Sequence, residues 1–311
     1  MKILAAFFRL IRWPNLVFIA LTQVLFFYAI VQSSLHPWQS TLFSNKYIAL
    51  LTLAYILIAA GGNIINDYFD LNIDIINKPD KLVVEKFISR RWVIILHFVT
   101  SLSGILIGGY LSKQMGQWLI FLSCIVSVLL LFLYSASLKK KFLIGNILVS
   151  ALTAWVILLI TLLEFAPFKQ MPEHIAMYRR IMRLGIVYTS FAFIISLIRE
   201  VIKDMEDVEG DRRYGCTTMP IVWGINATKV FLAVWLVVLT ASLILLQLYS
   251  LTFGWWLSIA YSLFFLILPL IWILKKLQKA QSKKDFHSLS NMVKLVMFAG
   301  ILSMLFFKLY A

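Results

Sequence analysis

Nine separate runs of mainly apolar residues dominate this sequence, and each is about as long as a membrane-spanning helix. A helix of about 20 residues crosses the ~30 Å hydrocarbon core of a bilayer, where backbone polar groups must be satisfied within the helix itself. We therefore predict an all-α, polytopic membrane protein in which a bundle of nine transmembrane helices forms one domain over residues 1–311. The predicted spans lie near 15–33, 47–66, 92–111, 117–136, 143–163, 184–203, 229–248, 254–274 and 291–310.

The composition excludes several other classes of protein. Apolar residues make up 61% of the chain and charged residues only 14%, whereas soluble domains carry about 25% charged residues. The net charge of +15 is expected to mark cytoplasmic loops and contacts with anionic lipid, so no nucleic-acid partner is predicted. Cys124 and Cys216 lie far apart and are expected to pack. The four histidines are scattered over different segments and offer no zinc site.

The distribution of Lys and Arg predicts how the chain is oriented in the cell membrane of a bacterium or archaeon. Segments on the N-terminal side of the bilayer carry 22 of the 29 basic residues. The positive-inside rule then places the N-terminus in the cytoplasm and the C-terminus outside. One outer segment fits poorly because it holds four basic residues, including Arg179 and Arg183. We interpret the stretch from Arg179 to Arg183 as a helix that lies along the interface.

Eleven of the fourteen acidic residues fall into two segments, 67–85 and 200–211, which both follow even-numbered spans on the predicted cytoplasmic side. In the first segment, Asn66, Asp70 and Asp74 are spaced four residues apart. If the second span continues as a helix, these three side chains share one face. The sequence therefore predicts that three oxygen-bearing side chains converge at the end of the second span.

The second acidic segment has a similar arrangement after the sixth span. Glu200, Asp204, Asp207 and Asp211 follow the spacing of one helical face. Clustered carboxylates near a bilayer repel one another unless cations neutralise them, and ionisable groups in a membrane are functional candidates. Oxygen ligands of this kind suit Mg²⁺, which characteristically takes one or two carboxylates together with phosphate oxygens and water. The two segments therefore predict a magnesium site.

Two other interpretations of the acidic segments remain open. The carboxylates could simply solvate the helix ends and pair with nearby Lys and Arg, and this is the role that we expect for Asp80, Glu85, Glu206 and Glu209. A transporter would instead use intramembrane acids as ion or proton sites near the bilayer midplane. The acids lie at span ends on one side of the membrane, and this position disfavours transport.

The two acidic segments resemble those of the UbiA superfamily of intramembrane prenyltransferases. The sequence Asn66-xxx-Asp70-xxx-Asp74 is similar to the first aspartate-rich motif of that superfamily. Its second motif resembles Asp207-xxx-Asp211 with Glu200 and Asp204 upstream. The resemblance covers most of the chain, and it extends to Arg12-Trp13-Pro14-Asn15, Tyr134-Ser135, Lys139-Lys140, Gly145-Asn146 and the segment from Gly215 to Gly224.

The resemblance implies a central cavity, covered by a polar cytoplasmic cap, that holds an isoprenoid diphosphate and Mg²⁺. It implies that the metal ligands are Asn66, Asp70, Asp74, Asp207 and Asp211. The four aspartates and Glu200, a candidate proton acceptor, are the expected catalytic residues. An aromatic side chain such as Tyr68, Phe69 or Tyr134 could stabilise a carbocation. The expected substrate-binding residues are Asn66, Asp67, Lys78, Lys81, Tyr134, Lys139, Lys140, Lys203, Asp204, Arg212, Arg12 and Asn15.

The lipophilic acceptor of the prenyl group is less constrained by the sequence. The string from Ile65 to Lys81 is most similar to the branch that makes digeranylgeranylglyceryl phosphate, in which a geranylgeranyl group is joined to the hydroxyl of a glycerol-phosphate ether lipid. The following residues, 82–86, depart from the turn that is common in relatives. An aromatic acceptor of quinone synthesis, 4-hydroxybenzoate or dihydroxynaphthoate, is the alternative.

Overall fold

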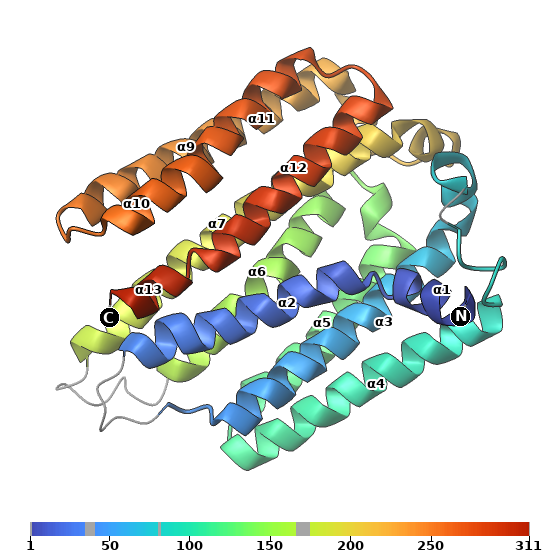
Figure 1. The fold of residues 1–311 in the computed structure, drawn as a ribbon. Helices are drawn as coiled ribbons and strands as arrows, with labels where there is room; N and C mark the ends of the chain where they lie inside the picture. Colours follow the sequence, from blue (N-terminus) through green and yellow to red (C-terminus); the bar gives the residue numbers. More distant parts are fainter. Residues whose placement is uncertain (1, 35–40, 80–81, 166–174, 311) are drawn as a thin grey trace.

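The computed structural model describes residues 2–34, 41–79, 82–165 and 175–310 and shows an all-helical bundle (Figure 1). Within these ranges, nine helices are long and apolar enough to cross a membrane. The prediction of an all-α membrane protein with nine spans is therefore confirmed. The N-terminus and the C-terminus lie at opposite ends of the bundle (Figure 1), as an odd number of spans requires.

The first five spans follow a short N-terminal helix, α1 (Lys2–Leu10). The first span is α2 (Trp13–Leu25), continued by a π-helical segment, Phe26–Val31, and one turn of 3₁₀ helix. The other four spans are α3 (Asn45–Asn77), α4 (Arg90–Met115), α5 (Trp118–Ala136) and α6 (Ile144–Phe165), with a 3₁₀ turn at Leu138–Lys140 between the last two.

The remaining four spans begin with the longest helix, α7 (Ile175–Arg213). A short helix, α8 (Met219–Val222), leads into α9 (Gly224–Leu251). The eighth span is composite, since α10 (Trp256–Ser262) passes through a π-helical segment, Leu263–Ile267, into α11 (Leu268–Lys279). The last span is α12 (Lys283–Leu302) followed by α13 (Leu305–Leu309).

Helices α3 and α7 each pack against several neighbours. Helix α3 contacts α2, α4 and α5 along its length, and α7 contacts α6, α9 and α12. Helices α9, α10 and α11 form a group on the far side of α7 and α12 from α3 and α4 (Figure 1). The two helices that carry the acidic segments are thus each surrounded by other helices, so that their polar ends are held in fixed positions.

The outer surface of the bundle is apolar, as lipid contact requires. On α9, for example, Val230, Leu245 and Leu248 are each more than half exposed. Apolar residues also fill the interior, and one cluster that includes Ile198, Leu236, Leu270 and Val293 joins α7, α9, α11 and α12. Apolar side chains therefore lie on both sides of these helices, which is characteristic of spans rather than of amphipathic helices in a soluble protein.

The helices that carry the acids extend well beyond the predicted spans. Helix α3 continues to Asn77 instead of ending near 66, and α7 continues to Arg213 instead of ending near 203. Hydropathy marks only the apolar part of each helix, whereas the helical backbone continues into a polar part. Because α3 continues as a helix through Asp74, Asn66, Asp70 and Asp74 share one helical face, as predicted.

Two details near helix ends correct the sequence-based interpretation. Arg179 and Arg183 do not belong to a separate interfacial helix, because α7 is continuous from Ile175 and both side chains lie exposed in its first turns. The separate helix α1 was not predicted. It is set off from α2 by Arg12, whose left-handed backbone (φ 52°) breaks the helix, a conformation that is uncommon for residues other than glycine.

Candidate active site

A polar pocket of about 490 Å³ lies where α3 and α7 end, on the side of the bundle that carries the N-terminus. Helix α1, the 3₁₀ turn after α5 and the start of α6 complete its wall. Charged and amide side chains dominate this wall, which is formed by Arg9, Arg12, Asn66, Asp67, Asp70, Ile73, Asp74, Asn77, Lys78, Tyr134, Lys139, Lys140, Gly145, Asn146, Glu200, Lys203, Asp204, Asp207, Asp211 and Cys216.

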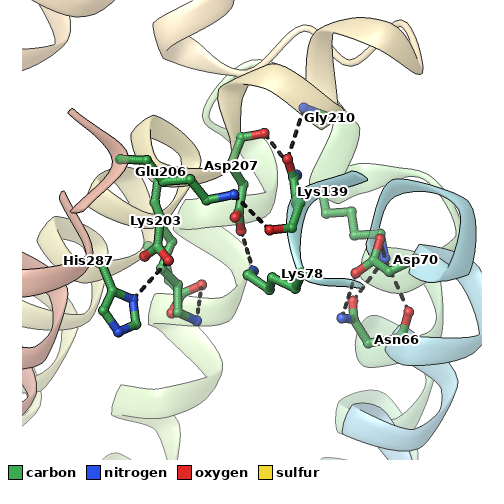
Figure 2. A network of polar contacts seen from close by, with 12 residues as sticks. Asn66, Asp70, Lys78, Lys139, Lys203, Glu206, Asp207, Gly210 and His287 are labelled. Atoms are coloured by element: carbon green, nitrogen blue, oxygen red, sulfur yellow. Dashed lines mark hydrogen bonds and ion pairs between the residues drawn. The ribbon is translucent and has the colours of Figure 1, made fainter. Parts of the chain in front are cut away.

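The first acidic motif is organised by contacts within α3 and by one lysine. The four-residue spacing allows the Asn66 Nδ2 to donate a hydrogen bond to Asp70 Oδ2 at 2.8 Å. Lys139, from the 3₁₀ turn after α5, reaches the same group. Its Nζ lies 2.6 Å from Asp70 Oδ1 and 2.9 Å from Asn66 Oδ1 (Figure 2). One ammonium group therefore contacts two of the three members of the motif, Asn66 and Asp70.

The second acidic motif depends on residues from α3. Lys78, directly after α3, forms an ion pair with Asp207 at 2.5 Å (Figure 2). The side chain of Asn77 donates to the Asp207 carbonyl oxygen at 2.9 Å and accepts from the Gly210 N–H at 2.9 Å. A Cβ at Gly210 would lie only 2.5 Å from Asn77 Nδ2, so glycine permits this close approach. Asn77 and Lys78 thus hold the end of α3 against α7.

Two further acids of the pocket have specific partners from other helices. Asp204 accepts a hydrogen bond from Asn146 Nδ2 of α6 at 2.8 Å. Asp67 pairs with the Arg12 guanidinium at 2.6 Å. The break at Arg12 therefore places this guanidinium at the wall of the pocket, beside the first motif.

Among the pocket groups in the connections between spans, burial and nearby charge change three pKa values in different ways. Burial lowers the pKa of Lys139 despite its contact with Asp70. Burial acts in the same direction on Lys78, but the Asp207 carboxylate outweighs it and the pKa of Lys78 is raised. Burial also raises the pKa of the Cys216 thiol to about 11. The sign differs between the two lysines because burial outweighs the Asp70 carboxylate at Lys139, whereas the Asp207 carboxylate outweighs burial at Lys78.

A second cavity, of about 220 Å³, adjoins the polar pocket from the interior of the bundle. We call it the apolar chamber because most of its wall is aliphatic or aromatic, including Leu16, Ile157, Phe191, Ile195 and Met297. The chamber and the pocket share wall residues, which are Arg12, Asn66, Tyr134, Glu200 and Lys203. An amphiphile could therefore place a charged head in the pocket and an apolar chain in the chamber.

Glu200 lies at the junction of the pocket and the chamber and is held by two cations. Its Oε1 lies 3.0 Å from Arg199 Nη1 and 2.9 Å from Lys203 Nζ. The Glu200 side chain is only 13% exposed. Its carboxylate is thus fixed in position where the two cavities meet.

The residues of the pocket fit a divalent cation that is shared with a ligand. In the described part of the chain, no three His, Cys, Asp or Glu side chains converge closely enough to hold an ion by themselves. Mg²⁺ does not require such a cluster, since it takes one or two carboxylates and fills its other positions with phosphate oxygens and water. Asp207 Oδ1 is buried and has no hydrogen-bond partner among the described residues, so this oxygen is available to a cation.

Most of the predicted site residues line the pocket. Asn15 instead lines the apolar chamber. Arg212 was placed wrongly: it is exposed at the end of α7 and lines neither cavity. Lys81 and Asp80 lie outside the described residues. Of the aromatic candidates, Tyr134 lines both cavities, whereas Tyr68 and Phe69 line neither.

The structure adds pocket and chamber residues that the sequence did not single out as ligands. They are Arg9, Asn77, Asn146, Arg199, Cys216 and Lys294. The sequence does contain a signal for Arg199, because two adjacent opposite charges inside a predicted span are unusual and mark a candidate functional position. Asn77 had no such signal, since its role depends on the distance between α3 and α7.

Three of the four acids expected to be peripheral lie in the described residues and have partners outside the pocket. Glu85 pairs with Arg90 at 3.4 Å and Glu209 with Arg213 at 3.3 Å. Glu206 lies 2.9 Å from His287 Nδ1 (Figure 2).

The fold and the two joined cavities define a multi-pass integral membrane protein whose site suits an amphiphilic ligand with an anionic head. The chain belongs to the UbiA prenyltransferase family, whose family model matches residues 16–301. It is therefore an enzyme of prenyl transfer, and the resemblance drawn from the two acidic motifs is confirmed.

Relatives and solved structures agree with this assignment. The chain is 30% identical to a digeranylgeranylglyceryl phosphate synthase of Methanosphaera stadtmanae over 83% of this chain and 87% of the relative. A solved structure of a digeranylgeranylglyceryl phosphate synthase superposes with a TM-score of 0.61 at 22% identity, covering 98% of this chain and 99% of the other. A UbiA homologue from Archaeoglobus fulgidus bound to DMAPP and Mg²⁺ gives a TM-score of 0.57 at 15% identity, with 96% and 98% covered.

Proposed function

We propose that this protein transfers a geranylgeranyl group from its diphosphate to the free hydroxyl of geranylgeranylglyceryl phosphate, in a reaction that requires Mg²⁺. The observation that carries the proposal is the direct junction between an acid-lined and lysine-lined pocket and an apolar chamber. The similarity to digeranylgeranylglyceryl phosphate synthases supports this acceptor.

In this proposal the polar pocket binds the donor diphosphate. Asn66, Asp70, Asp74, Asp207 and Asp211 would hold Mg²⁺, which neutralises the charge on the diphosphate oxygens and makes the diphosphate a better leaving group. Lys78 and Lys139 lie within 2.6 Å of the aspartates, so both ammonium groups are close enough to turn to diphosphate oxygens. Charge-assisted hydrogen bonds of this kind are among the strongest that side chains make.

The apolar chamber would hold the prenyl chain and exclude water from the reacting carbon. The allylic carbon–oxygen bond breaks and its electron pair leaves with the diphosphate, whose charge is stabilised by the fixed cations of the pocket. Exclusion of water prevents hydrolysis of the electron-deficient allylic group. The acceptor oxygen then forms the new ether bond to the same carbon, and Glu200 at the junction is the candidate to receive the hydroxyl proton.

We further propose that the pocket end of the bundle faces the cytoplasm and that one UbiA-like domain spans the whole chain. The excess of Lys and Arg in the connections at this end supports the orientation. The family match over residues 16–301 supports the single domain.

A competition assay tests the proposed function directly. Purified protein is incubated with Mg²⁺ and geranylgeranyl diphosphate, and geranylgeranylglyceryl phosphate, 4-hydroxybenzoate and dihydroxynaphthoate are offered together. We expect mass spectrometry to find digeranylgeranylglyceryl phosphate as the product. A prenylated aromatic product would move the protein to quinone synthesis, and failure to release diphosphate with any acceptor would contradict the proposed donor chemistry.

A further inference from the structure

The apolar chamber contains more positive charge than its carboxylate can balance. Its wall includes four cations and one carboxylate, Glu200. Arg12 is balanced by Asp67 at 2.6 Å. Arg199 and Lys203 share Glu200, and Lys294 forms no ion pair with any residue that the structure describes. Among the described residues that line the chamber, the positive charges therefore exceed the carboxylates that pair with them by two.

Lys294 is in an unusual place for a lysine that has no carboxylate partner among the described residues. It follows Lys283, the first residue of α12, by eleven positions, which is roughly 16 Å along a helix axis. Its Nζ lies 5.4 Å from the centre of the Phe18 ring of α2, across the chamber wall. The nearby charge of Arg199 repels it. Ionisable residues inside a membrane are costly and are characteristically paired or functional.

Arg199 also has hydrogen-bonding capacity that the protein does not use. Its side chain is 16% exposed, and Nη1 donates to Glu200 at 3.0 Å. Its Nε–H is buried without a hydrogen-bond partner among the described residues. A buried donor without a partner costs about 1–3 kcal/mol, and more when it is charged. An anion placed between Arg199 and Lys294 would satisfy this donor and separate the two like charges.

We infer that Arg199, Lys203 and Lys294 form a second anion site, on the chamber side of the junction at which Lys203 also borders the diphosphate pocket, and that this site binds the phosphate monoester of the acceptor lipid. The inference rests on the proposed function and names the group that recognises its acceptor. In a glycerol phosphate with a free central hydroxyl, the hydroxyl-bearing carbon is next to the phosphate-bearing carbon. A phosphate at this site therefore brings the hydroxyl to Glu200, at the junction where the reacting carbon of the donor lies.

The site also separates the two negatively charged substrates. The diphosphate would use Arg12, Lys78 and Lys139 of the pocket, and the acceptor phosphate would use cations from α7 and α12. Each anion then has its own cations, so the two substrates can be bound at the same time. This arrangement favours an acceptor that carries a phosphate.

The first test compares Lys294→Met with Lys294→Arg and with a matched control, Lys308→Met, an exposed lysine of α13. Loss of a charged hydrogen-bond donor to phosphate should raise the KM for geranylgeranylglyceryl phosphate about tenfold or more, with the KM for geranylgeranyl diphosphate unchanged. Lys294→Arg should stay close to the wild type. Geranylgeranylglycerol, which lacks the phosphate, should be used equally by the wild type and Lys294→Met. An equal rise in both KM values, or an equal effect on the phosphate-free acceptor, would overturn the inference.

A binding experiment separates this inference from the proposed function. Protein in phosphatidylcholine nanodiscs, without Mg²⁺ or donor, is titrated with geranylgeranylglyceryl phosphate, with geranylgeranylglycerol or with phosphatidic acid. We expect preferential binding of the first ligand and loss of that preference in Lys294→Met. If this result is obtained but no ether lipid is made, the acceptor phosphate site is supported and the proposed transfer reaction is contradicted. If geranylgeranylglyceryl phosphate binds no better than geranylgeranylglycerol, or if phosphatidic acid binds equally well, the acceptor phosphate site is contradicted, whichever reaction the enzyme catalyses.

Discussion

The two acidic motifs look alike in sequence but are held in place in different ways. The first is organised mainly within one helix, where Asn66 contacts Asp70 one turn away. The second is held by residues from other elements, since Asp207 pairs with Lys78, and Asp204 with Asn146 of α6. The difference teaches that the first motif is largely local, with Lys139 as its contact from outside α3, whereas the second depends on the packing of α3, α6 and α7.

The largest expected effect comes from removing one charge from each motif. Asp70→Asn and Asp207→Asn should each lower kcat about 10²–10³-fold, because electrostatic stabilisation of the leaving group is the main catalytic contribution. Diphosphate release at limiting Mg²⁺ measures this loss. Glu209→Gln is the control, since Glu209 is exposed and, among the described residues, forms an ion pair with Arg213 alone. Full activity in either aspartate variant would show that its motif does not take part in binding the metal and diphosphate.

The two lysines provide the next comparison. Lys139→Met should raise the KM for the donor about tenfold, and Lys78→Met should raise it less, because Lys139 is the less exposed cation and contacts two members of its motif, Asn66 and Asp70. Each variant should also bind Mn²⁺ more tightly in the absence of donor, since an aspartate loses its competing ammonium. Mn²⁺ titration followed by electron paramagnetic resonance measures this second effect.

Arg212→Gln is the matched control for the lysine variants, because Arg212 is exposed outside the pocket. It should leave both the donor KM and the Mn²⁺ affinity unchanged. Weaker Mn²⁺ binding in the lysine variants would contradict the view that the lysines compete with the metal.

A smaller effect should appear in stability. Asn77→Ala removes two hydrogen bonds to α7 and should lower the free energy of unfolding by about 2 kcal/mol. Asn66→Ala should cost less, because one of its two hydrogen bonds, to Asp70, lies within its own helix and the other, from Lys139, joins it to another element, whereas both bonds of Asn77 join α3 to α7. Thermal unfolding in detergent compares the two variants. Equal losses of stability in the two variants would contradict the view that the first motif depends less than the second on packing between helices.

The smallest effect concerns the thiol beside the second motif. Because the pKa of Cys216 is raised to about 11, its reactive thiolate is scarce at neutral pH and increases as the pH rises towards that value. In a Cys124→Ala background, maleimide labelling should therefore accelerate about tenfold per pH unit between about pH 8 and pH 10. A plateau near pH 8.5 would contradict the raised pKa. Geranylgeranyl diphosphate with Mg²⁺ should slow the labelling.

The sequence predicts the spans and the first motif well because both depend on short-range patterns. Apolar runs identify helices by length alone, and the spacing of Asn66, Asp70 and Asp74 requires only that α3 continue. The partners of the second motif depend on long-range packing, and neither Asn77 nor Asn146 was predicted as a ligand. Arg212 was misplaced because it follows Asp211 in sequence, although the next residue on a helix points in a different direction.

Lys294 shows the same limit in another form. In the sequence it is one basic residue near the start of the last span, one of the 22 assigned to the N-terminal side of the bilayer. Its significance depends on which charges surround it in three dimensions. Only the packing of α12 against α2 and α7 brings it to the chamber that Arg199 also lines.

The ion pairs of the polar pocket have a consequence for how the protein is made. Asp70 and Asp207 are already paired with lysines of the same chain, so the negative ends of α3 and α7 can come together without an external cation. The order of events in biogenesis is then free: the helices can insert and assemble first, and the metal can arrive later with the first diphosphate. We therefore expect folding of the protein not to require magnesium.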